Sequence, residues 1–195
     1  MRPADTPAVC HALVPEQLVR YANELATLAM ADHPELFAAG ERAAEQARLC
    51  ATSLGRPRPE VLVAAARLHG IGHLPDVVKT GFAPVDGAVY LLGLGWPAPV
   101  VTLVGHQLQA RMVARYLGGG PQLSLLTRIQ GWPADILDFA LLTTGPAGVR
   151  TVSQGLQALG RAQDADERIP ERVRDERLAR LSRAGNRVDQ ALTAA

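Results

Sequence analysis

Two histidines that follow an apolar segment, His69 and His73, are the first candidates for chemistry in this sequence. Residues 62–68 are almost all apolar, and a short Gly-Ile-Gly turn separates the two histidines. Imidazole is a ligand for divalent metals and an acid–base group close to neutral pH. A pair of histidines around a tight turn therefore indicates a candidate metal or catalytic site.

The segment that carries His69 has helical spacing. Leu62, Ala65, Ala66 and His69 recur at i, i+3, i+4 and i+7, so they share one face of a helix that begins near Pro59. Similar periodicity covers most of the chain, and the sequence has no strand-like alternation. The pattern predicts an all-α domain. Further helices are expected at 15–31, 34–54, 86–92, 98–106, 107–117, 133–142, 152–162 and 171–192, with a break at 118–121.

Composition narrows the class of protein. A chain of 195 residues, 48% of them hydrophobic, is long enough for one domain with a well-formed core. The net charge of +1 gives no electrostatic reason to expect a nucleic acid or an anionic membrane as partner. Cys10 and Cys50 are the only cysteines, so we expect a reduced, cytoplasmic setting rather than a disulfide scaffold.

Neither a membrane span nor a leader is expected. The most apolar stretch, 88–104, is interrupted by two glycines and two prolines. Residues 1–9 lack the apolar core of a signal peptide.

Three ordered stretches resemble the small bacterial HD-domain proteins, which belong to a superfamily of metal-dependent phosphohydrolases. The stretches are residues 41–47 with 62–73, residues 80–91 with 103–107, and residues 140–146. The resemblance extends over about 35–148, more than half of the chain. It implies an HD-domain-like helical bundle over residues 15–165, an N-terminal extension at 1–14, and a charged helix at 166–195 that packs on the domain or extends from it.

The resemblance also implies where metal ligands would stand. The family typically holds its metal with an early His, a His-Asp pair and a late Asp, and some members add histidines from the middle helices. On this sequence the four principal positions fall at Glu35, His69, Gly70 and Leu141, and the middle histidines at His106 and Gln107. Glycine has no donor atom and leucine presents a hydrocarbon. We therefore expect a degenerate site, without the standard metal and without a cofactor.

Two alternatives remain open for the ligands. Glu35, His69 and His106 make a two-histidine, one-carboxylate set that suits non-haem iron or another transition metal, as in a phosphohydrolase with a rearranged metal site. His33 is a second candidate for the early histidine, although that alignment disturbs the match at 40–47.

Other polar residues have both a structural and a functional interpretation. His73 either packs after the turn or binds a ligand. Arg111 and Arg115 lie one turn apart and are either solvated or face the pocket, where they would bind a phosphate or carboxylate. The candidates for ligand binding are thus His73, His106, Gln107 and Arg111.

A pocket without the standard metal leaves two classes of function. The first is a protein that binds a small molecule or a partner in the former active site. The second is a metal-independent enzyme, hydrolase-like or lyase-like, in which Glu35 and His69 act as general acid and base. The fold does not determine the substrate, so the sequence names none.

Overall fold

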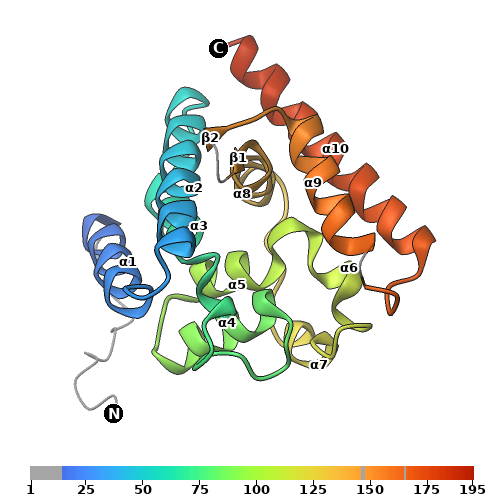
Figure 1. The fold of residues 1–195 in the computed structure, drawn as a ribbon. Helices are drawn as coiled ribbons and strands as arrows, with labels where there is room; N and C mark the ends of the chain where they lie inside the picture. Colours follow the sequence, from blue (N-terminus) through green and yellow to red (C-terminus); the bar gives the residue numbers. More distant parts are fainter. Residues whose placement is uncertain (1–14, 146–147, 165) are drawn as a thin grey trace.

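The computed structural model describes residues 15–145, 148–164 and 166–195, so the N-terminal extension, Cys10 and Pro146 lie outside the described residues. Within that part the chain is all-α apart from one pair of very short strands, which confirms the expected fold class (Figure 1). The elements are α1 (Pro15–Ala29), α2 (Pro34–Ser53), α3 (Pro59–Leu68), η1 (Ile71–His73), α4 (Ala83–Gly93), α5 (Ala98–His106), η2 (Gln107–Gln109), α6 (Arg111–Ala114), α7 (Gly120–Ser124), α8 (Trp132–Thr143), β1 (Thr144–Gly145), β2 (Gly148–Val149), α9 (Val152–Asp164) and α10 (Glu171–Thr193).

Prolines mark the starts of several helices. α2, α3, α4, α5 and α8 each carry a proline at the first or second helical position, where a missing N–H leaves no helical hydrogen bond unmade. The carboxylate of Asp32, two residues before Pro34, does not cap α2. His33 is the N-cap residue, and no side chain makes a capping hydrogen bond there.

Helix α8 lies at the centre of the molecule. Figure 1 shows it nearly end-on, with α2 and α3 on one side and α9 and α10 on the other. Residues 135–143 of this helix are all buried, which explains why its sequence is apolar nearly all round. The charged helix α10 packs against α8 and α9 through buried residues that include Leu181 and Val188. Val173, near its start, joins a second buried cluster with Val113 and Ala114 of α6.

The prediction of one helix over 107–117 is wrong. Leu108 and Gln109 have positive φ angles of 48° and 55°, which an α-helix cannot contain, so η2 and the short α6 replace it. Contacts from distant helices stabilise this conformation. The N–H of Leu108 donates to Oδ1 of Asp138 over 2.6 Å, and Nε of Arg177 donates to the carbonyl oxygen of Leu108 over 2.7 Å.

The strand pair is the second departure from the expected helices. β1 and β2 are antiparallel, with Thr144 opposite Val149 and Gly145 opposite Gly148. The hairpin reverses the chain after α8 and returns Arg150 to the end of that helix. Among the described helices, none combines the length and the hydropathy needed to span a membrane.

Candidate functional site

A cavity of about 520 Å³ lies where the first half of α2, the end of α3 and the end of α8 meet. It brings together Glu35, His69 and Leu141, three of the four positions at which the resemblance places the principal metal ligands. These residues come from three different helices or helix ends. The other lining residues are Pro34, Ala38, Ala39, Arg42, Thr144, Gly145 and Arg150.

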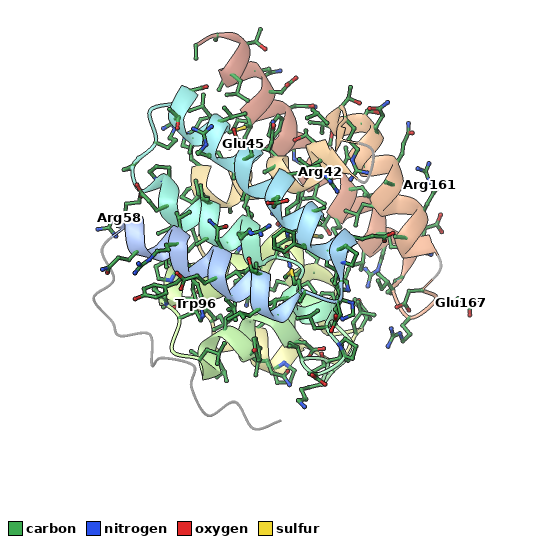
Figure 2. The ribbon with its side chains drawn as sticks, turned by 60° about the vertical axis from the view of Figure 1, so that its left-hand side comes forward. Arg42, Glu45, Arg58, Trp96, Arg161 and Glu167 are labelled. Carbon is green, nitrogen blue, oxygen red and sulfur yellow. The ribbon has the colours of Figure 1, made fainter. Side chains whose placement is uncertain are left out.

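One face of α2 forms a wall of this cavity. Glu35, Ala38, Ala39 and Arg42 are spaced at i, i+3, i+4 and i+7, so all four point the same way. The two alanines have small side chains and leave room for the cavity. Glu35 is exposed at the rim, whereas Arg42 is half-buried and its Nε is buried without a hydrogen-bond partner. Figure 2 shows Arg42 between α2 and the C-terminal helices.

His69 caps the end of α3 and turns its ring toward the cavity. Its Nδ1 lies 2.8 Å from the carbonyl oxygen of Ala66, so the ring bonds its own helix rather than Glu35. A carbonyl oxygen only accepts, so Nδ1 carries the proton and Nε2 keeps its lone pair for a ligand. Burial lowers the pKa of His69 to about 4. The ring is therefore neutral at pH 7.

Arg150 supplies a second positive charge. Its Nε donates to the carbonyl oxygen of Leu142 over 2.7 Å, which anchors the side chain across the end of α8. A Cβ on Gly145 would lie 3.2 Å from Nη1 of Arg150, so the glycine gives the guanidinium room. Burial, and then the charge of Arg161, lower the pKa of Arg150. In the described part of the chain no carboxylate pairs with Arg42 or Arg150.

The residues of this cavity do not fit the metal that the resemblance to HD-domain proteins implies. Gly70 has no donor atom, and Leu141 turns a hydrocarbon to the cavity. Glu35 and His69 are the remaining donors of the four positions. Among the described residues no group of three His, Cys, Asp or Glu side chains is placed to hold a metal ion. The donor set of Glu35, His69 and His106 is therefore not assembled.

His106 and Gln107 lie outside this cavity. They line a void of about 10 Å³ together with Gln109, Arg128 and Asp138, which has room for no more than one water molecule. Nε2 of His106 lies 3.3 Å from the carbonyl oxygen of Leu126, and Nε2 of Gln107 donates to the carbonyl oxygen of His69. The expectation that both residues line one pocket with Glu35 and His69 is wrong, because these bonds hold their side chains within the core.

His73 and Arg111 also lie away from the cavity. His73 is exposed on η1, and Arg111 is exposed at the start of α6. Arg115 is likewise exposed, as its solvated interpretation expects. Of the residues assigned to catalysis or ligand binding, the structure brings only Glu35 and His69 into this cavity.

Arg42 and Arg150 are the site residues that sequence reasoning missed. Arg42 had a readable signal, because it lies seven residues after Glu35 on a helix that begins with Pro34. Arg150 had no such signal, because the pairing of β1 with β2 after α8 brings it to the cavity.

The chain was compared with protein-family models, with curated proteins and with solved structures, and none of the three comparisons found a match.

Proposed function

We propose that this chain is an HD-like helical domain with a degenerate metal centre, and that its cavity binds a small molecule carrying a carboxylate or phosphate group. The observation that carries this function is the pair of half-buried arginines, Arg42 and Arg150, which face one cavity without a carboxylate partner in the described part of the chain. A bound anion would supply the missing negative charge.

The HD-like assignment has support that does not depend on the arginines. The resemblance places ligand positions at Glu35, His69 and Leu141, and these widely separated residues line the same cavity. Gly70, the fourth position, directly follows His69. Such convergence is expected of a cavity inherited from a metal site.

Each polar residue of the cavity has a role in this function. Arg42 and Arg150 bind the anionic group, and guanidinium N–H groups match the two oxygens of a carboxylate or phosphate. The neutral ring of His69 accepts a hydrogen bond at Nε2 from a hydroxyl or amine of the ligand. Glu35, exposed at the rim, receives a second donor.

A metal-independent enzyme is the weaker candidate. A general base works best when its pKa lies near the working pH, and burial lowers the pKa of His69 to about 4. Its ring is therefore a weak base at pH 7. The proposed role of His69 is therefore to bind the ligand rather than to transfer a proton.

Calorimetric titration with inorganic phosphate and with citrate tests the function. We expect saturable binding of at least one of them to the full chain, weakened tenfold or more in Arg42→Gln and in Arg150→Gln. Arg183→Gln, which removes an exposed arginine of α10, is the matched control and should bind like the parent. Binding that neither cavity variant weakens, or no saturable binding of either anion, would contradict the assignment.

A further inference from the structure

A second, separate cavity of about 400 Å³ lies between the first turns of α3, α5 and α8. Its volume falls within the range of roughly 300–1,000 Å³ that is usual for small-molecule sites. None of its lining residues lines the first cavity. Arg42 of the first cavity and Arg58 of the second lie well apart in Figure 2.

The walls of this second cavity are apolar. Leu62, Leu103 and Ile136, which are 3%, 3% and 0% exposed, form its floor, and Val61 and Trp132 lie closer to the surface. Two arginines are the only charged residues among those that line it, and no lining residue is acidic. An apolar body with a negative group would therefore complement this cavity.

Arg56 is the residue that makes the cavity favour a negatively charged ligand. Its guanidinium carbon lies 4.2 Å from the centre of the Trp132 ring, so the cation is stacked on the cavity wall. Its Nε is buried and has no hydrogen-bond partner. A buried donor without a partner is costly, and an anion that accepts from it would remove that cost.

The helix ends add to the positive potential. α3, α5 and α8 begin at Pro59, Ala98 and Trp132, and residues of their first turns line the cavity. The start of a helix carries a partial positive charge. A proline at the first or second position of each helix removes one N–H donor from each helix start, and the partial charge of the helix ends adds to the charge of Arg56.

We propose that this cavity binds a small amphipathic carboxylate, with its alkyl or aryl body against Leu62, Leu103 and Ile136 and its carboxylate on Arg56. The two oxygens of a carboxylate match Nε–H and the neighbouring Nη–H of a guanidinium. The site is independent of the anion proposed for the first cavity, because the two cavities share no lining residue.

Octanoate is a suitable probe, with 1-octanol and octylamine as neutral and cationic molecules of the same body. Isothermal calorimetry on the full chain at pH 7 should show octanoate binding at least tenfold more tightly than 1-octanol, and no saturable binding of octylamine. Octanoate should also change the tryptophan fluorescence. Trp132→Phe should abolish that change because Trp96, the other tryptophan, does not line the cavity.

Variants then test where the carboxylate and the alkyl body of octanoate bind. Arg56→Gln should weaken octanoate tenfold or more and leave 1-octanol unchanged, and the retained alcohol binding shows that the cavity is still folded. Val61→Trp should fill the cavity and abolish both. Arg183→Gln, which removes an exposed arginine outside both cavities, should alter neither.

Four results would overturn the proposed site. One is an equal affinity of the cavity for octanoate and 1-octanol. Another is octanoate binding that survives both Arg56→Gln and Val61→Trp. The third is the absence of saturable octanoate binding to the parent. The fourth is loss of octanoate binding in Arg42→Gln with no loss in Arg56→Gln, which would place the carboxylate in the first cavity instead.

Discussion

Gln107 donates from Nε2 to the backbone carbonyl oxygen of His69 over 2.9 Å. This bond joins the turn after α5 to the end of α3. The position of His69 in the cavity therefore depends on a residue that does not line the cavity. The resemblance expects a metal-binding histidine at position 107. This chain has Gln107 there, and its buried amide makes a structural hydrogen bond instead.

Gln107→Leu should lower the free energy of unfolding by about 1–3 kcal/mol, because it leaves the carbonyl oxygen of His69 without this donor in a buried place. Urea unfolding measures the loss. Gln190→Leu, at an exposed position of α10, is the matched control and should change stability by about 0.5 kcal/mol or less. A similar small change in both variants would show that the bond to His69 contributes little.

The two glycines of the His-Gly-Ile-Gly-His motif should differ in how much the same substitution destabilises the fold. Gly70 has a helical φ of −87°, and a Cβ there would lie 3.6 Å from Leu36. On Gly72 a Cβ would lie 1.9 Å from the carbonyl oxygen of Ala83, because α4 packs directly on this turn. Gly70→Ala should be nearly neutral, whereas Gly72→Ala should cost about 2 kcal/mol or more.

Thermal and urea unfolding of these two variants provides the measurement. Equal losses of stability would contradict the close approach of α4 to Gly72. A large loss for Gly70→Ala would contradict the open space beside Gly70.

The helices could be predicted from the sequence where local signals determine their starts and ends. Pro34, Pro59 and Pro133 mark helix starts that the structure places at or within one residue of each proline. The helix predicted over 107–117 failed because Asp138 and Arg177 hold Leu108 in a left-handed conformation. These partners lie 30 and 69 positions away in the chain, so no window around Leu108 contains them.

The cavity was readable in part for the same reason. His69 follows a helix with clear periodicity, and Glu35 lies on another, so both positions could be named from sequence. Tertiary contacts place the remaining residues. The hairpin after α8 brings Arg150 into the cavity, and hydrogen bonds to carbonyl oxygens keep His106 and Gln107 out of it.

Asp138 should make stability fall with rising pH. Burial raises the pKa of Asp138 to about 7, although donors from Gln109 and Leu108 oppose the shift. Between about pH 4 and 7 the folded state then binds a proton that the unfolded chain has released, so the free energy of unfolding decreases as pH rises. Asp138→Asn removes this dependence.

Urea unfolding of the parent and Asp138→Asn at pH 4, 6 and 8 tests the shift. The stability of the variant relative to the parent should rise with pH, by on the order of 2–4 kcal/mol over this interval. Asp175→Asn, at an exposed position of α10, should give no such trend. A constant difference between parent and Asp138→Asn would show that folding does not raise the pKa of Asp138.

His69 should act in the opposite direction. Burial lowers its pKa to about 4, whereas the unfolded chain takes up a proton near the ordinary value. The contribution of His69 to the free energy of unfolding is therefore complete above about pH 6.5, and it is lost as the pH falls toward 4. Nitrogen-15 NMR should show the Nδ1–H form of His69 at pH 7 and a titration near pH 4. A titration near pH 6.5, or an Nε2–H ring, would contradict the buried ring that bonds Ala66.

Restoring the ligands that the resemblance expects tests the proposed degenerate metal centre most directly. The triple variant Glu35→His, Gly70→Asp and Leu141→Asp puts back all three side chains, and the helical backbone of Gly70 accepts an Asp. Leu141 is 7% exposed, so a carboxylate there should destabilise the metal-free variant. A control with Asn at positions 70 and 141 keeps the shapes and removes both negative charges.

The measurement is the thermal unfolding midpoint with and without manganese or zinc. We predict that metal raises the midpoint of the triple variant by several degrees, as expected for roughly 2–3 kcal/mol of stabilisation when the metal is about 100 times its Kd. The parent and the Asn control should gain much less. Equal effects of metal on the triple variant and the parent would contradict the account, because Glu35, His69, Gly70 and Leu141 would then not mark a former metal site.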